Sequence, residues 1–283
     1  MLASRTMGSG DRPYDLAEPS STRETPVIVE VPHAGIEMPP EVMAQIDVPQ
    51  ACFARDADLF VDELYADATL EGATLIRANI SRYVIDLNRA EDDVDAESVE
   101  GASAIARAPR GVIWRLSGDG ARVFAKPLRR AELERRLAAY HRPYHAELRR
   151  VLAHKLERFG VAVVLAAHSM PSHARWASGA IGPARADVVP GTRGRTTADG
   201  RFIDAVESLA AVHGWSVRHD DPYRGGFTTT HYGRPGDRVH AVQVELARRL
   251  YMDEERLALH TKSVDVRAWC RGLVAKLGEL ALR

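Results

Sequence analysis

Val161-Ala-Val-Val-Leu-Ala-Ala-His-Ser169 is the stretch that decides how this chain is expected to fold. Every residue from Val161 to Ala167 is apolar, which is typical of a strand in a parallel sheet that helices cover on both faces. His168 follows at the carboxyl end of this strand, and ligands of such sheets collect beyond the carboxyl ends of the strands. The stretch therefore predicts a buried strand that presents a histidine to a site.

Strand-like and helix-like segments alternate on both sides of this stretch. Alternation of this kind predicts an α/β fold, here a single three-layer α/β/α domain around a mixed, mostly parallel sheet. Pro143 is expected to split or kink the longest helix near Arg142. The other expected strands are 25–31, 73–77, 83–87, 187–190, 215–219 and 239–246, and the expected helices are 56–69, 127–159, 197 or 199 to 213, and one that begins at 253.

Composition limits the classes of function that fit the chain. It has 283 residues, is 45% hydrophobic and carries a formal net charge of −1, so charge alone attracts it to neither nucleic acid nor a membrane surface. Two distant cysteines and the lack of an apolar segment long enough to span a bilayer predict a cytoplasmic protein. Residues 1–24 are expected to form a flexible arm, and residues 25–283 a single domain.

Two histidines follow strand-like runs. His33 ends the run in Val29-Glu-Val-Pro-His-Ala-Gly35, and His168 ends the run described above. Imidazole is a common zinc ligand, and a catalytic zinc usually has three protein ligands, so a carboxylate is needed as the third. Glu37 and Asp56 are both candidates for it. The alternative is that each histidine is a structural residue.

The segment Arg82-Tyr-Val-Ile-Asp-Leu-Asn-Arg89 has an arginine at each end of a short apolar run. A guanidinium group can bind a carboxylate through two hydrogen bonds, so the segment predicts an anion-binding site. The alternative is a structural ion pair with Asp86. Arg193 lies on a glycine-flanked loop that could reach the same ligand, or it is a solvated surface residue.

Glu245 lies in the otherwise apolar strand candidate Ala241-Val-Gln-Val-Glu-Leu246. Burying a carboxylate is unfavourable unless the group is paired or has a function. Partial burial would raise the pKa of Glu245 toward the range that suits a general base acting on water. A buried ion pair is the alternative.

A set of short motifs in a consistent order resembles the N-formylglutamate amidohydrolase family and, more distantly, aspartoacylase and the zinc carboxypeptidases. The resemblance covers roughly residues 25 to 260, and eight motifs in this order are specific. The motifs are Pro32-His-Ala-Gly35, Arg55-Asp-Ala-Asp58, Ser81-Arg-Tyr-Val-Ile-Asp-Leu-Asn-Arg89, Arg142-Pro-Tyr-His145, His168-Ser-Met170, Gly225-Gly226, Tyr232-Gly233 and the run from Ala241 to Glu254.

This resemblance implies a zinc-dependent amidohydrolase with a zinc-carboxypeptidase-like domain and an eight-stranded or similar sheet. Its substrate would be a small N-acylated acidic amino acid, most simply N-formyl-L-glutamate. By this resemblance the zinc ligands are His33, Asp56 and His168, Glu245 activates the water, Arg82 stabilises the oxyanion, and Asn88 and Arg89, with Arg193 assisting, hold the substrate carboxylate.

One position departs from the pattern of the family. Relatives usually carry an acid two residues before the second zinc histidine, where this chain has Ala166. Such carboxylates often orient a metal-bound imidazole. The departure leaves two alternatives open: hydrolysis of another N-acyl amino acid or of a peptide carboxyl end, and a non-catalytic carboxylate-binding protein.

Overall fold

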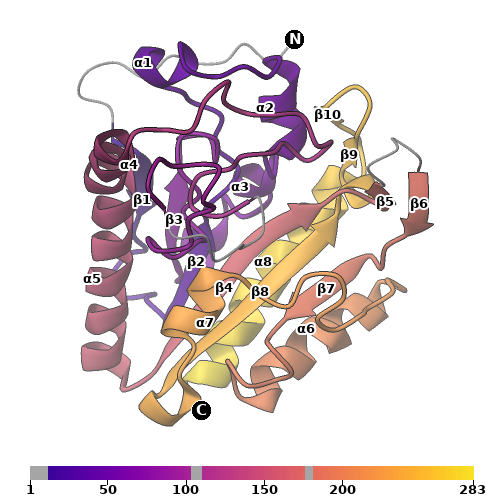
Figure 1. The fold of residues 1–283 in the computed structure, drawn as a ribbon. Coiled ribbons are helices and arrows are strands. Elements are labelled where there is room, and N and C mark those ends of the chain that lie inside the picture. Colours follow the sequence, from indigo (N-terminus) through magenta and orange to yellow (C-terminus); the bar gives the residue numbers. More distant parts are fainter. Residues whose placement is uncertain (1–11, 103–109, 176–180) are drawn as a thin grey trace.

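A computed structural model describes residues 12–102, 110–175 and 181–283 of the chain, and a six-stranded sheet lies at its centre (Figure 1). The four central strands run parallel, and an antiparallel strand closes each edge. The predicted mixed, mostly parallel sheet is therefore confirmed. In spatial order the strands are β1 (Tyr14–Ala17), β3 (Thr74–Ala78), β2 (Val27–Val31), β4 (Ala162–Met170), β8 (Val239–Ala247) and β7 (Val188–Gly191).

Strand β4 is the central strand that its apolar sequence predicted. All of its residues are buried, and it pairs in parallel with β2 on one side and β8 on the other. Because side chains alternate between the faces of a sheet, Val163 and Leu165 pack into one hydrophobic layer while Ala162 and Val164 pack into the other. His168 falls on the same face as Ala162 and Val164.

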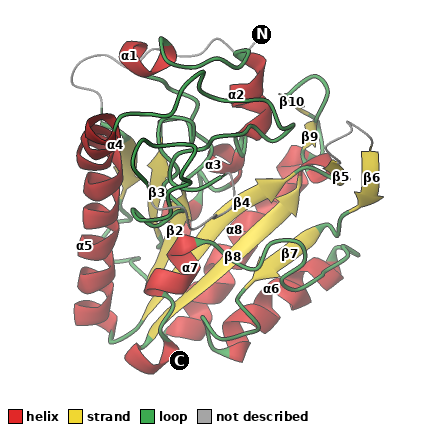
Figure 2. Cartoon of the chain, viewed as in Figure 1, coloured by secondary structure: helices red, strands yellow, loops and turns green. Residues whose placement is uncertain are grey.

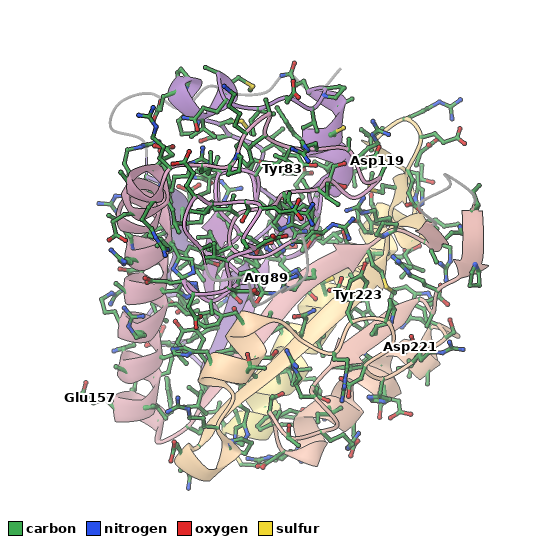
Figure 3. The ribbon with its side chains drawn as sticks, viewed as in Figure 1. Tyr83, Arg89, Asp119, Glu157, Asp221 and Tyr223 are labelled. Carbon is green, nitrogen blue, oxygen red and sulfur yellow. The ribbon has the colours of Figure 1, made fainter. Side chains whose placement is uncertain are left out.

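Helices cover both faces of this sheet (Figure 2). Helices α3 (Val61–Leu64), α6 (Gly200–Val212) and α8 (Ser263–Ala281) pack against one face. Helices α4 (Arg130–Arg136) and α5 (Arg142–Phe159), together with the irregular segment around residues 80–128, pack against the other. On the outer side of α5, Glu157 points away from the sheet (Figure 3). The arrangement is the expected α/β/α sandwich.

The remaining elements are short. They are α1 (Pro40–Met43), α2 (Ala51–Asp56), η1 (Ala68–Glu71), the π-helical turn η2 (Leu137–His141), α7 (Phe227–Tyr232), η3 (Pro235–Asp237), η4 (Arg248–Leu250), and the paired strands β5 (His173–Arg175) with β6 (Ile181–Ala184) and β9 (Met252–Asp253) with β10 (Ala258–Leu259). Among the described residues, no helix has both the length and the apolar character needed to cross a bilayer.

Several predicted elements were wrong. Residues 83–87 form turns instead of a strand, although their side chains are buried. Burial without a sheet partner gives the same apolar pattern in the sequence as a strand, because here the backbone bonds to neighbouring loops, as in Asp86 N–H to the Val112 carbonyl at 2.9 Å. Residues 56–69 split into short helices, residues 215–219 form one isolated bridge, and the last helix begins at Ser263.

The long helix predicted at 127–159 is interrupted where Pro143 suggested. Helices α4 and α5 are joined by the π-helical turn η2, and Pro143 lies in the first turn of α5. Proline has no N–H to donate to a helical hydrogen bond, so the regular α-helical pattern is interrupted before it, here by the wider π-helical turn. Part of the N-terminal segment that was expected to be a loose arm forms the edge strand β1.

Helix α4 anchors the segment around residues 82–89 through a buried arginine. Arg136 is fully buried and donates hydrogen bonds to the Val84 carbonyl at 2.9 Å and to Glu132 Oε1 at 2.8 Å. A buried guanidinium group needs such a partner, because an unpaired buried charge is strongly destabilising. The ion pair with Glu132 thus compensates the buried charge of Arg136, and the hydrogen bond to the Val84 carbonyl holds the segment 82–89 against α4.

Replacing Glu132 by Gln is expected to lower the free energy of unfolding by about 2–3 kcal/mol at pH 7. Hydrogen bonds from Arg135 and Arg136 lower the pKa of Glu132 to about 2, although burial opposes this. A carboxylate with a lowered pKa stabilises the fold above its ordinary pKa and loses that contribution as the pH falls toward the lowered value. Denaturant unfolding at pH 7 and pH 3 should therefore show a smaller difference from wild type at pH 3. An equal loss at both pH values would contradict this, and Glu157→Gln is the matched surface control.

Candidate active site

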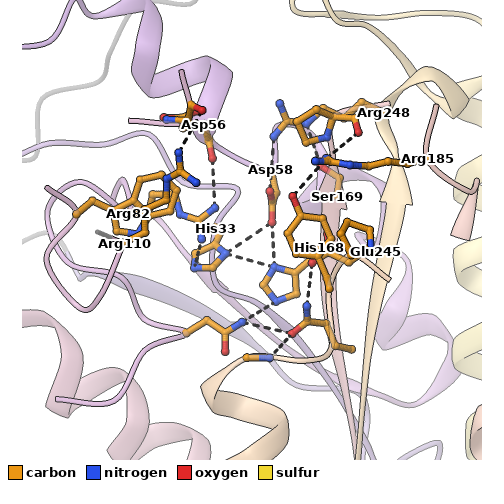
Figure 4. Close-up of a pocket in the computed structure, with 18 of the residues that line it drawn as sticks. His33, Asp56, Asp58, Arg82, Arg110, His168, Ser169, Arg185, Glu245 and Arg248 are labelled. Atoms are coloured by element: carbon orange, nitrogen blue, oxygen red, sulfur yellow. Dashed lines mark hydrogen bonds and ion pairs between the residues drawn. The ribbon is translucent and has the colours of Figure 1, made fainter. Parts of the chain in front are cut away.

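A cavity of about 700 Å³ opens beyond the carboxyl ends of β2, β4 and β8. It is lined by residues that follow these strands and by loops that are far apart in the sequence. This is the position at which α/β sheets usually bind ligands, because the loops after parallel strands converge there. Figure 4 shows His33, Asp58 and His168 at its centre, with Arg82 and Arg110 on one side and Arg185 on the other.

Two histidines and one aspartate meet in the cavity. His33 Nδ1 lies 3.3 Å from His168 Nδ1, and Asp58 Oδ2 lies 3.0 Å from His168 Nδ1 and 3.7 Å from His33 Nδ1. All three residues are buried. The two histidines come together because β2 and β4 are neighbouring parallel strands that end at the same edge of the sheet.

The three donor atoms fit a divalent metal ion. In a tetrahedral site with bonds of about 2.0–2.2 Å, ligand atoms lie about 3.2–3.6 Å apart, close to the separations observed here. Burial opposes ionisation of Asp58, but hydrogen bonds and charge from His168 and His33 outweigh it and hold the pKa of Asp58 below its ordinary value. Two imidazole nitrogens and an ionised carboxylate oxygen form a donor set that suits zinc and related ions.

Asp58, and not Asp56, joins the histidines, which corrects the choice made from the sequence. The Asp56 carboxylate accepts hydrogen bonds from the Tyr83 hydroxyl and from the Gly118 N–H. Helix α2 ends at Asp56 and the chain becomes extended at Ala57, so the side chain of Asp58 turns toward His33 instead. The Asp58 N–H also bonds to the His33 carbonyl at 2.9 Å, which fixes the two segments together.

Glu37, the other candidate, is not brought to the histidines either. Its backbone pairs with Asn79 and Ile80, and the residue lines a second, separate cavity. The turn after His33 thus directs Glu37 away from His33, Asp58 and His168.

Arg248 holds the loop that carries Asp58. Its guanidinium donates to the Arg55 carbonyl at 2.7 Å and the Ala57 carbonyl at 2.6 Å, and it lies 3.7 Å from Asp58 Oδ1. Arg248 was not predicted as a site residue. It lies three residues after Glu245, directly after β8, and its place in the run from Ala241 to Glu254 was the signal that could have indicated it.

Asp86 is a second residue that the sequence analysis did not assign to the site. Its carboxylate lies 2.8 Å from His33 Nε2 and accepts hydrogen bonds from Trp114 Nε1 at 2.8 Å and from Arg82 at 3.0 Å. Because an ionised carboxylate only accepts, His33 carries its proton on Nε2 and directs the lone pair of Nδ1 toward Asp58 and His168. Burial opposes ionisation, but His33 and Arg82 keep the pKa of Asp86 well below its ordinary value.

The structural ion pair considered for the arginine segment exists, and Arg82 still lines the cavity. Its guanidinium group pairs with Asp86, lies 3.2 Å from His33 Nε2 and stacks 4.3 Å from the centre of the Trp114 ring. Arg82 is thus held beside His33, on the wall that Figure 4 shows opposite Arg185.

Glu245 lies next to His168 because β4 and β8 are paired in register at these two residues. Side chains of residues paired in parallel strands point to the same face, so both enter the cavity. Burial raises the pKa of Glu245; the charge of His168 opposes this, and that of Asp58 adds to it. A buried carboxylate with a raised pKa beside a metal-binding group is suited to general base catalysis.

The other predicted contact residues also line the cavity. Asn88 Nδ2 lies 3.2 Å from His168 Nε2, and the Arg89 guanidinium donates to the carbonyls of Arg110 and Asn88. Arg193 lies on the loop after β7 with a left-handed backbone, φ 54°. The structure thus brings Asn88, Arg89 and Arg193 to one cavity.

The cavity is rich in positive charge. Of the described residues, eight arginines line it against four acids, which favours an anionic ligand. Five of these arginines were not predicted as site residues, and they come from segments that are far apart in the chain: Arg55, Arg110, Arg185, Arg224 and Arg248.

The position expected to carry an acid near His168 holds Ala166, and a neighbouring strand supplies a carboxylate instead. Glu30 on β2 is paired in register with Ala166, is fully buried, and accepts hydrogen bonds from Tyr144 and Thr228. Burial raises the pKa of Glu30, an effect that the charge of His168 opposes. A carboxylate is therefore present on the same face of the sheet as His168.

The chain is similar to proteins of one family. The sequence profile described as N-formylglutamate amidohydrolase matches residues 25–252. The N-formylglutamate deformylase of Pseudomonas aeruginosa is 34% identical over 233 residues, covering 81% of this chain and 83% of the relative, and that of Pseudomonas putida is 33% identical, covering 81% and 82%. The crystal structure of N-formylglutamate amidohydrolase from Ralstonia eutropha aligns with a TM-score of 0.86 at 31% identity, over 96% of this chain and 98% of that one.

Proposed function

Because this chain belongs to the N-formylglutamate amidohydrolase family, we propose that it hydrolyses the amide bond of N-formyl-L-glutamate to formate and L-glutamate. The observation that carries the proposal is the group of His33, Asp58 and His168 beside a buried Glu245 in an arginine-lined cavity. The relatives named above are called N-formylglutamate deformylases, and the positive cavity suits a substrate with two carboxylates.

We take His33, Asp58 and His168 as the residues that hold a divalent metal ion, most simply Zn²⁺. Such an ion, when bound, would act as a Lewis acid that polarises the formyl carbonyl and lowers the pKa of a water molecule. Asp86 orients the ring of His33, and Arg248 holds the loop of Asp58. These contacts support a preformed binding group that needs little rearrangement.

Glu245 is the proposed general base. It accepts a proton from the attacking water as the oxygen bonds to the formyl carbon, and it returns that proton to the amide nitrogen as the carbon–nitrogen bond breaks. The products are formate and the free amino group of glutamate. Arg82 stabilises the negative charge that develops on the carbonyl oxygen, while Asn88, Arg89 and Arg193 hold the substrate carboxylates.

The direct test is formate release from N-formyl-L-glutamate by purified protein supplied with zinc. Release should depend on added metal, stop with a chelator, and be absent in His33→Ala. Metal content per chain, measured without prior chelation, gives an independent readout. Metal-loaded protein that releases no more formate than His33→Ala would exclude this substrate, and well under one metal ion per chain would favour a non-catalytic carboxylate-binding protein.

The size of the cavity supports a second candidate substrate class. At about 700 Å³ the cavity is in the range that accommodates drug-sized ligands, so N-formyl-L-glutamate would leave part of it unfilled. N-acetyl-L-glutamate and longer N-acyl derivatives therefore belong in the same assay. A higher kcat/KM for one of these than for the formyl compound would identify a different acyl group as the substrate.

Replacing Arg193 by Leu is expected to raise KM for N-formyl-L-glutamate about 10-fold or more, with little change in kcat. The reason is that Arg193 lines the cavity and would lose a charge-assisted hydrogen bond to a substrate carboxylate. Steady-state kinetics measure both constants. Arg201→Leu, on the exposed side of α6, is the control and should leave them unchanged; an unaltered KM in Arg193→Leu would remove Arg193 from the substrate site.

A further inference from the structure

Gln243 is a buried amide in a strand of apolar residues. It lies in β8 two residues before Glu245, so both side chains point to the same face of the sheet. Gln243 is 4% exposed, lines the cavity, and has the apolar residues Val242 and Val244 as its chain neighbours. A buried amide is unfavourable unless its donors and acceptor are used, which makes its partners informative.

The backbone fixes which way this amide faces. The Gly226 N–H, at the start of α7, donates to Gln243 Oε1 at 2.8 Å. Only the oxygen of the amide can accept this bond, so the amide nitrogen must lie on the other side, where Gln243 Nε2 donates to Glu245 Oε1 at 2.8 Å. Gln243 thus links Gly226, the residue before α7, to the proposed general base Glu245, and its amide can satisfy both contacts in only one orientation.

Asn88 is oriented in the same way. The Thr228 N–H donates to Asn88 Oδ1 at 2.9 Å, so Asn88 Nδ2 faces His168 Nε2 at 3.2 Å and Gln243 Oε1 at 3.5 Å. The contact leaves no room at Gly226, where a Cβ would lie 2.3 Å from the Asn88 amide nitrogen. The start of α7 therefore orients both the amide that faces His168 and the amide that faces Glu245.

The hydrogen bond from Gln243 occupies one oxygen of Glu245 and leaves the other available. Within the described part of the chain, Gln243 Nε2 donates to Glu245 Oε1, and no side chain or backbone group donates to Oε2. A carboxylate held by one oxygen presents the other in a fixed direction, which is what proton transfer from a water molecule requires.

We propose that Gln243 is a positioning residue that orients the carboxylate of Glu245 by donating a hydrogen bond to it, with the backbone N–H of Gly226 as its anchor. The inference rests on the proposed role of Glu245 in hydrolysis. A positioning role differs from a substrate contact because it acts on the chemical step, so it changes kcat and leaves KM nearly unchanged.

Two variants of Gln243 test its two hydrogen bonds, the one that it accepts from Gly226 and the one that it donates to Glu245. Gln243→Met is similar in size and removes both donor and acceptor. Gln243→Glu keeps an acceptor for the Gly226 N–H but, when ionised, has no hydrogen to donate to Glu245. Both are expected to lower kcat about 10- to 100-fold with KM within about threefold of wild type. Gln50→Met, at an exposed position before α2, is the matched control and should behave as wild type.

Metal content and melting temperature are measured on the same samples. Unchanged metal content together with a lower kcat supports positioning. A kcat within twofold of wild type in both variants, or a raised KM at constant kcat, would overturn the proposal. If Gln243→Met does not fold, Gln243→Glu still gives the kinetic answer. A wild-type protein that releases no formate would instead reject the proposed function.

Discussion

Asp58→Ala is expected to lose the bound metal ion and to reduce formate release by at least about 1,000-fold, while Asp56→Ala keeps its metal. The Asp58 carboxylate lies within 3.0 and 3.7 Å of the two Nδ1 atoms that would hold the ion, whereas Asp56 bonds to Tyr83 and Gly118. Removing one of three protein ligands removes the Lewis acid, which contributes several kcal/mol to the reaction.

Comparing Asp58→Ala with Asp56→Ala distinguishes the loss of a metal ligand from a general destabilisation of the loop that carries both residues. Metal content is measured by elemental analysis, and folding by thermal unfolding, for each variant and for wild type. Asp56→Ala is expected to be less stable than wild type because it loses two hydrogen bonds, but to retain one metal ion per chain. Loss of metal from Asp56→Ala with retention in Asp58→Ala would restore the choice that the sequence motif first favoured.

Glu245→Gln is expected to reduce kcat about 10²- to 10⁴-fold with unchanged metal content, because an amide cannot accept the proton of the attacking water. The same group should control the acid side of the pH profile. Burial raises the pKa of Glu245, and only the ionised form accepts a proton, so wild-type kcat/KM should fall as the pH drops through this raised pKa. This part of the profile should disappear in Glu245→Gln.

Glu157→Gln is the matched control for this prediction, since Glu157 points from α5 into solvent (Figure 3). It should reproduce the wild-type rate and pH profile. A Glu245→Gln protein with more than about a tenth of wild-type kcat, at full metal occupancy, would show that another group accepts the proton.

Local sequence patterns were sufficient to predict the central strands and the proximity of the two histidines. The apolar run of β4 and the run before His33 each predicted a buried strand, and parallel strands present their carboxyl ends at one edge. Nothing more than this rule was needed to expect His33 and His168 to lie close together. The same rule explains why Glu245, at the end of β8, is in the cavity.

The third acid could not be chosen from local patterns. Asp56 and Asp58 are two residues apart in one motif, and both are charged, short and close to a helix end. Their side chains point in different directions because the backbone is extended at Ala57. Hydrogen bonds from Arg248 to the carbonyls of Arg55 and Ala57 hold this conformation. Arg248 and Ala57 are 191 residues apart in the chain, so no local rule connects Arg248 with this loop.

The sequence by itself determined the layered α/β fold, because the periodicity of apolar side chains reports which faces of a strand or helix are buried. It also determined which residue types were available for catalysis. Tertiary structure alone decided which acid joins His33 and His168, that Asp86 orients His33, and that Gln243 holds Glu245. Hydrogen bonds of this kind depend on distances of a few ångströms between segments that are far apart in the chain. These distances cannot be predicted from the order of the residues.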